Sequence, residues 1–299
     1  MAIVDYSRRM TKPRRQAAPN GDLASFERSV FESDGFSHAV FRKGTGPAVL
    51  VITEMPGISP QVLGFADRVV ALGCTAVLPD LFGEAGRDPL GPTKLSSTWY
   101  GLTNMVRACI SREFTTFALG KSSPVVTWLR SLAAREHTRC GGPGVGVVGM
   151  CFTGGFALAM ASDPRVLAPV VSQPSLPFAI SARHRSSIDC SQEQLHSVAE
   201  RCSRDGLRVL GLRFEDDPLV PAQRFRFLKE QLGDGFIAVE IPQARRHPAG
   251  PLPNAHSVLT GDLIDEPGEP TRNALDQVLA LFREKLLRQA PRDTQQPPS

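Results

Sequence analysis

Residues 145–156 read VGVVGMCFTGGF, an apolar run that ends at a cysteine and is followed by two glycines. A valine-rich run of this length, broken sharply and continued by FALAMA, predicts a fully buried strand that turns directly into a helix. Cys151 stands at the break, where the chain would hold it on the tip of a tight turn. This position fits a nucleophile or a buried filler, and partners elsewhere in the chain decide between the two.

Apolar runs alternate with helical patterns on both sides of this break. Further strands are predicted over 47–54, 74–82, 166–174, 207–215 and 236–242, and helices over 62–73, 122–137, 191–206, 222–233 and 271–289. Residues 26–46 indicate an early pair of strands, and Ser122 or Ser123 is the expected N-cap of the second helix. Such alternation predicts an α/β fold with a mostly parallel, doubly wound sheet and helices on both faces.

The length of 299 residues and the lack of an internal repeat or linker favour one domain. We expect this domain over residues 23–289, between a disordered basic N-terminal arm at 1–22 and a disordered C-terminal tail at 290–299. Residues 83–111 contain clusters of Gly, Pro and Ser, and residues 92–123 are a candidate lid.

The composition, 41% hydrophobic and 21% charged, is that of an ordinary globular protein. We find no run of about 18 apolar residues and no secretory signal, so we expect a cytoplasmic protein without a membrane partner. Much of the net charge of +4 lies in RRMTKPRR at 8–15, which fits a solvated arm better than a nucleic-acid site. The six cysteines lack ligand spacing, so neither a metal site nor disulfides are predicted.

Three residues suited to nucleophilic catalysis follow separate predicted strands. Cys151 ends one strand, Asp217 in FEDDPLVP follows another, and His256 in PNAHSVLT lies after the last one. The carboxyl ends of parallel strands meet at one edge of a sheet, so the three side chains are expected there together. Their chain order, nucleophile then acid then histidine, is that of the α/β-hydrolase arrangement, in which the nucleophile occupies a strained strand-to-helix elbow.

The segments GMCFTGG, DPLVP and NAHS, together with VITEMPGI at 51–58 and AVLPDLF at 76–82, resemble the dienelactone hydrolase family of α/β-hydrolases. The resemblance covers residues 40–288. It implies that Cys151 is the nucleophile, that His256 is the base and that Asp217 orients the histidine. The family pattern D-x-x-V-P, with its valine at Val220, selects Asp217 over Asp216.

The resemblance also implies supporting groups. Glu54 matches a family glutamate that sits beside the cysteine and takes part in raising the thiolate. The backbone N–H groups of Met55 and Phe152 match an oxyanion hole. The family's type enzyme holds the substrate carboxylate with an arginine four residues after the histidine. This sequence has Thr260 there, and Arg87 in FGEAGRD is the candidate replacement.

Elementary chemistry gives each triad residue a task. A free thiol has a pKa near ~8.5, so Cys151 needs a base such as His256, and the helix that follows it favours the thiolate further. Asp217 would fix the tautomer of the histidine and stabilise its charged form. Attack on a carbonyl would give an acyl-thioester that water hydrolyses. We therefore predict a carboxylic ester hydrolase of the carboxymethylenebutenolidase type, a monomer or homodimer that acts on a small lactone or ester without metal or organic cofactor.

Alternative interpretations remain open. The same triad could serve a carboxylesterase or thioesterase, or the fold could be a non-catalytic binding protein. His247, in RRHPAG, competes with His256, but its surroundings are typical of an exposed loop. The segment GVGVVG at 144–149 satisfies the pattern G-x-G-x-x-G, yet a dinucleotide-binding fingerprint must follow a strand and open a helix. These glycines lie within the predicted strand itself, which argues against dinucleotide binding.

Overall fold

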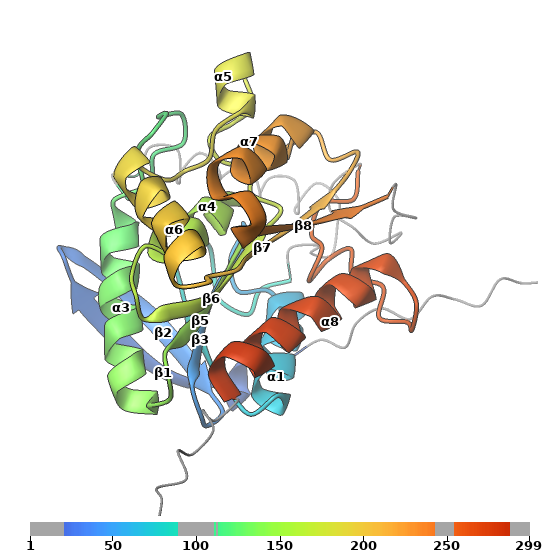
Figure 1. The fold of residues 1–299 in the computed structure, drawn as a ribbon. Helices are drawn as coiled ribbons and strands as arrows, with labels where there is room; N and C mark the ends of the chain where they lie inside the picture. Colours follow the sequence, from blue (N-terminus) through green and yellow to red (C-terminus); the bar gives the residue numbers. More distant parts are fainter. Residues whose placement is uncertain (1–20, 89–110, 112, 243–253, 288–299) are drawn as a thin grey trace, which may run out of the picture.

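The structure is a computed structural model that describes residues 21–88, 111, 113–242 and 254–287. Its framework is an eight-stranded sheet in the order β1-β2-β4-β3-β5-β6-β7-β8 (Figure 1). The strands are β1 Glu27–Ser33, β2 Phe36–Lys43, β3 Ala48–Ile52, β4 Thr75–Pro79, β5 Val145–Met150, β6 Val166–Ser172, β7 Val209–Phe214 and β8 Phe236–Ile241. The β1–β2 and β2–β4 pairs are antiparallel, and every other pair is parallel.

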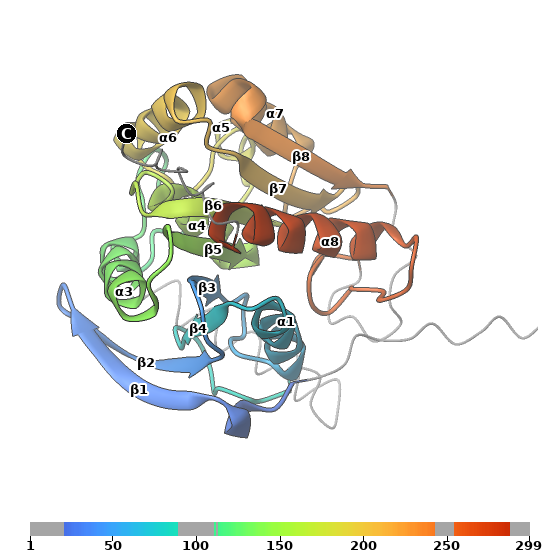
Figure 2. The ribbon, with the colours of Figure 1, turned by 60° about the horizontal axis from the view of Figure 1, so that its bottom comes forward.

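Helices cover both faces of this sheet (Figures 1 and 2). They are α1 Pro60–Ala71, α3 Val125–Cys140, α4 Gly154–Met160, α5 Ala182–Arg185, α6 Gln192–Arg204, α7 Ala222–Leu232 and α8 Pro270–Phe282, with short turns η1 Leu23–Ser25, η2 Cys151–Thr153, η3 Gly233–Gly235 and η4 Arg283–Leu287. One core cluster joins the sheet to α1 and α8, and the other joins it to α3, α4, α6 and α7. The predicted doubly wound α/β fold is confirmed.

The continuous apolar runs of the sequence are explained by burial on both faces. Every residue of β3, β4, β5 and β7 is buried, as expected of parallel strands covered by helices on either side. The outer strand β1 has no buried residue, and β8 is buried only at its two ends. The central strands therefore form a rigid base whose carboxyl ends carry loops.

One predicted helix cap is wrong. Helix α3 begins at Val125 with Pro124 in the N-cap position, and no side chain caps it. The Ser123 hydroxyl instead donates to a carboxyl oxygen of the buried Asp189 at 2.6 Å, so a tertiary contact takes the group that local sequence assigns to the cap.

Some of the predicted features lie outside the described ranges. These are the C-terminal tail, all but two residues of the N-terminal arm, and most of the candidate lid at 92–123. The single domain over 23–289 stays a prediction. None of the helices in the described part of the chain has both the length and the apolar character needed to cross a membrane.

Candidate active site

Cys151 occupies a sharp turn between β5 and α4. Its backbone φ is +56°, in the left-handed region that side chains other than glycine rarely adopt. Thr153 stabilises this turn, because its hydroxyl accepts from the Met150 N–H at 2.9 Å and donates to the Ile52 carbonyl at 2.8 Å. A strained residue held in this way is typical of functional sites. The geometry is that of a strand-to-helix elbow with the thiol at its tip.

Glycines allow the elbow to pack closely. A Cβ on Gly149 would lie 2.2 Å from the Thr153 carbonyl oxygen, and one on Gly154 would lie 2.7 Å from Cα of Pro174. No side chain fits at either position without displacing backbone. Gly149 lies inside β5 rather than after it, which removes the main support for dinucleotide binding.

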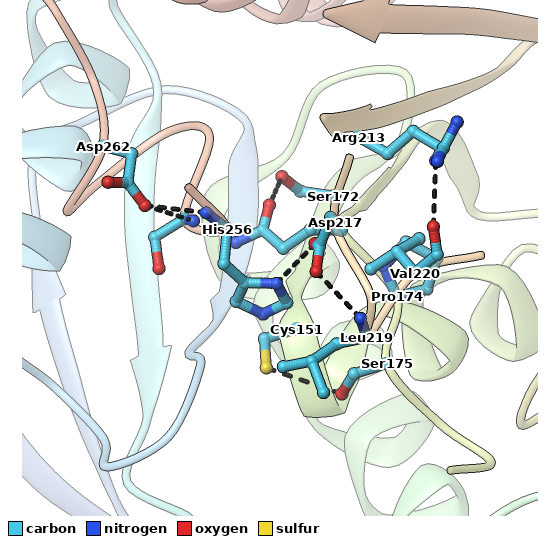
Figure 3. A network of polar contacts seen from close by, with 12 residues as sticks. Cys151, Ser172, Pro174, Ser175, Arg213, Asp217, Leu219, Val220, His256 and Asp262 are labelled. Carbon is cyan, nitrogen blue, oxygen red and sulfur yellow. Dashed lines mark hydrogen bonds and ion pairs between the residues drawn. The ribbon is translucent and has the colours of Figure 1, made fainter. Parts of the chain in front are cut away.

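Asp217 and His256 meet beside the elbow, although 39 positions separate them in the sequence. Nδ1 of the imidazole lies 2.6 Å from Oδ2 of Asp217, and both residues are only 3% exposed. The other oxygen of Asp217 accepts from the Leu219 N–H at 3.0 Å. Figure 3 shows the imidazole between the carboxylate and the Cys151 sulfur. The structure therefore brings the three predicted residues together.

The buried Arg213 holds the loop that carries Asp217. From β7, its guanidinium donates to the carbonyl of Val220 at 3.0 Å (Figure 3). It also donates to the carbonyl of Glu215 at 2.6 Å and pairs with Glu240. The two carbonyls lie on either side of Asp217 along the chain. The sequence signal that could have indicated this role is the presence of an arginine in the otherwise apolar run VLGLRF of β7.

Asp262 holds the loop that carries His256. Its Oδ2 accepts from the backbone N–H groups of His256 at 2.8 Å and Ser257 at 3.0 Å (Figure 3). The Asp262 N–H donates back to the Ser257 carbonyl at 3.0 Å, which closes the loop on itself. Residues 254–263 of this loop form no helix or strand, so this carboxylate fixes the backbone on which the imidazole stands.

The electrostatics of the site favour protonation of the histidine once the Cys151 sulfur is ionised. Burial disfavours the imidazolium, but the negative charges of the ionised Cys151 sulfur and of the Asp217 carboxylate outweigh this and raise the pKa of His256 well above its ordinary value. The sulfur lies near enough for this effect, although it does not meet the geometry of a hydrogen bond with the buried Nε2, which has no partner among the described residues. A protonated His256 is the state that follows proton transfer from the thiol.

Glu54 is a nearly buried carboxylate just after β3, held by uncharged donors. Its Oε2 accepts from the Ser257 hydroxyl at 2.7 Å and the Gln173 amide at 3.2 Å, and its Oε1 accepts from the Thr260 hydroxyl. Thr260 thus contacts the carboxylate from the position where the resemblance led us to look for an arginine. Gln173 was not predicted from the sequence. It lies in the polar segment SQPS, 172–175, and the position of this segment at the end of a buried strand is the signal that could have indicated a site residue.

The two predicted oxyanion donors follow neighbouring strands. Met55 comes three residues after the end of β3, and Phe152 comes two after the end of β5. These strands pair in parallel, with Ile52 opposite Gly149. The two backbone N–H groups therefore belong to adjacent strand ends at the edge where the thiol lies.

Other predicted residues are less closely tied to this site. Arg87 lies on an exposed loop, where its guanidinium pairs with Glu84 at 3.2 Å. His247 lies outside the described residues. In the described ranges, His, Cys, Asp and Glu form no group of three or more that could hold a metal ion.

Comparisons with known proteins bear on the family and the fold of the chain. The model of the dienelactone hydrolase family matches residues 37–241, more than half of the chain. The structure of a candidate dienelactone hydrolase from Klebsiella pneumoniae subsp. pneumoniae superposes with a TM-score of 0.53 and 16% identity, covering 87% of this chain and 98% of that one. A dienelactone hydrolase-like promiscuous phosphotriesterase from metagenomic libraries superposes with a TM-score of 0.54 and 15% identity, covering the same shares. These two structures bear on the α/β-hydrolase fold alone. No curated protein matches the chain significantly.

Proposed function

Because the chain belongs to the dienelactone hydrolase family of ester-bond hydrolases, we propose that it opens a small lactone or ester through a Cys151–His256–Asp217 triad. The observation that carries the proposal is the buried 2.6 Å contact between Nδ1 of His256 and Asp217, beside a cysteine held at φ +56°. A buried carboxylate bound to the far nitrogen of a histidine is the arrangement that makes the near nitrogen an effective base.

The reaction would begin with transfer of the thiol proton from Cys151 to Nε2 of His256. The thiolate then attacks the carbonyl carbon, and the negative oxygen that forms accepts hydrogen bonds from the N–H groups of Met55 and Phe152. The imidazolium returns its proton to the leaving oxygen as the carbon–oxygen bond breaks, which leaves an acyl-thioester on Cys151. In a lactone, that leaving oxygen stays attached to the acyl chain.

Hydrolysis of the acyl-thioester would complete the cycle. His256 takes a proton from a water molecule while the water oxygen attacks the thioester carbon, and the carbon–sulfur bond then breaks. The proton held by His256 returns to the sulfur, so the free thiol is regenerated. Asp217 stabilises the imidazolium during both halves of the reaction without itself being protonated.

A second candidate function is hydrolysis of a different acyl substrate, as in a carboxylesterase or thioesterase. Thr260, rather than an arginine, contacts Glu54, and the three hydrogen-bond donors that the described residues offer to that carboxylate are uncharged. This favours an acyl group without a carboxylate on that side of the site. A dienelactone carboxylate would need another cation, and Arg87 is the residue we propose for it.

The test is a hydrolysis screen over lactones, esters and thioesters with Cys151→Ala. We expect the variant to lose activity on every substrate by about 10³-fold or more, because no nucleophile remains at the elbow. Cys202→Ala, on α6, is the matched control and should keep full activity. Mass spectrometry of the wild-type protein should find the acyl group on the Cys151 peptide. Hydrolysis by Cys151→Ala at the wild-type rate would overturn the proposal.

A further inference from the structure

The Cys151 sulfur has a second polar neighbour besides the histidine. Oγ of Ser175 lies 3.5 Å from Sγ of Cys151 on the side away from the imidazole, and it is drawn with its dashed contact in Figure 3. Ser175 is only 3% exposed. Within the described part of the chain, the Cys151 sulfur is the one hydrogen-bond partner of the Ser175 hydroxyl. A buried hydroxyl requires such a partner, so this contact is part of the site rather than an incidental approach.

We propose that Ser175 is a catalytic residue of this site, whose hydroxyl accepts the S–H of the resting Cys151 thiol and donates its O–H to the thiolate. The proposal rests on the nucleophilic role proposed above for Cys151. A hydroxyl can serve both states, because it offers one donor and two acceptor positions and its hydrogen rotates freely. Nothing heavier than a hydrogen atom needs to move between them.

The histidine supports this assignment of the resting state. Nε2 of His256 has no hydrogen-bond partner among the described residues, so the S–H of the resting thiol is directed to Ser175 and not to the base. When the thiol proton passes to Nε2, the sulfur gains a negative charge and the O–H of Ser175 turns toward it. A hydrogen bond to a charged acceptor is stronger than one to a neutral group, so the contact favours the thiolate.

The backbone around Ser175 holds the hydroxyl in place. Its N–H donates to the Cys151 carbonyl at 2.9 Å, which joins the serine directly to the elbow. The preceding carbonyl, of Pro174, accepts from Arg224 at 2.6 Å, and the same fully buried guanidinium also donates to the carbonyls of Pro177 and Ser187. Arg224 therefore fixes the segment from both sides, and Ser175 is a preorganised donor rather than a mobile one.

The experiment measures the alkylation of Cys151 by iodoacetamide across a pH series, read by mass spectrometry of its peptide. In Ser175→Ala we expect the midpoint of the profile to move upward by about one pH unit, because the thiolate loses a donor. We expect kcat/KM on the best ester substrate to fall roughly tenfold. Ser175→Thr keeps a hydroxyl and should return the midpoint toward the wild-type value.

The matched control is Ser162→Ala, which removes a half-buried hydroxyl just beyond the opposite end of α4 and should leave the midpoint unchanged. Thermal unfolding checks that each variant is folded, and Ser175→Gly gives the same test if the alanine variant is not. A wild-type midpoint in the folded Ser175→Ala or Ser175→Gly variant would overturn the proposal. Because alkylation needs no ester substrate, this result is independent of the hydrolysis test on Cys151→Ala.

Discussion

Two buried aspartates have separate tasks at the histidine. Asp217 contacts the imidazole itself at Nδ1, whereas Asp262 accepts from the backbone N–H groups of His256 and Ser257. The motif DPLVP is enough to indicate the first residue. The second could not be found from a motif, because its partners are backbone groups that any residue carries. The position of His256 thus depends on a side chain that no local pattern reveals.

At the scale of the residue, we predict that Asp217→Asn reduces kcat by roughly 10³–10⁴-fold. The amide keeps the shape of the side chain but removes the negative charge that stabilises the imidazolium, so the pKa of His256 should also fall. Asp216→Asn, an exposed carboxylate one position away, is the control and should keep wild-type kcat. Steady-state kinetics and the pH profile of each variant make the measurement. Equal losses in the two variants would contradict the role given to Asp217.

At the scale of the element, the unit β5–η2–α4 combines a buried strand, an elbow and a glycine-rich helix start. The strand and the break follow from the sequence, because a continuous valine-rich run is what burial on both faces requires. The sequence does not explain why two glycines follow Thr153. Gly154 faces Pro174 and Gly155 faces Asp189, and both neighbours come from the chain beyond β6. Only the folded chain shows which segments press against this helix.

These contacts lead to different expectations for two adjacent glycines. A Cβ on Gly154 would lie 2.7 Å from Pro174, next to Ser175, whereas one on Gly155 would lie 2.7 Å from the Asp189 carbonyl oxygen. We expect each alanine variant to lose about 1–3 kcal/mol of unfolding free energy through overpacking. Gly154→Ala should in addition shift the Cys151 alkylation profile, because it displaces the segment that carries Ser175. Urea unfolding and alkylation of both variants test this, and identical alkylation profiles would count against it.

At the scale of the whole molecule, the site is assembled by the topology of the sheet. Glu54, Cys151, Ser175 and Asp217 follow β3, β5, β6 and β7, which are successive neighbours in the sheet, and His256 comes from the loop beyond β8. Parallel strands end at the same edge, so chain order alone was enough to predict that the triad residues meet. It was not enough to predict Gln173 or Ser175, since a polar residue after a strand can equally face solvent. The packing of the helices determines whether such a residue faces solvent or the site.

The last prediction concerns a buried carboxyl that joins distant parts of the fold. Asp189 is only 1% exposed, and it accepts from the backbone N–H of Ser123 at 3.0 Å, from the Ser123 hydroxyl at 2.6 Å and from the Thr115 hydroxyl at 3.4 Å. Burial raises the pKa of Asp189 to about 7, although these hydrogen bonds oppose the change. The folded protein therefore holds a proton that the unfolded chain releases near pH ~3.9.

The sign of the resulting pH dependence follows from that difference. The stability contributed by protonated Asp189 is fully present below about pH 4 and is lost as the pH rises through about 7, by roughly 1.4 kcal/mol for each pH unit that separates the folded and unfolded pKa values. In Asp189→Asn the site cannot titrate, so its unfolding free energy should rise relative to wild type by a few kcal/mol between pH 4 and 8. Urea unfolding across this range measures the difference, with the exposed Asp234→Asn as control. A difference that stays constant with pH would show that Asp189 is already ionised in the folded protein.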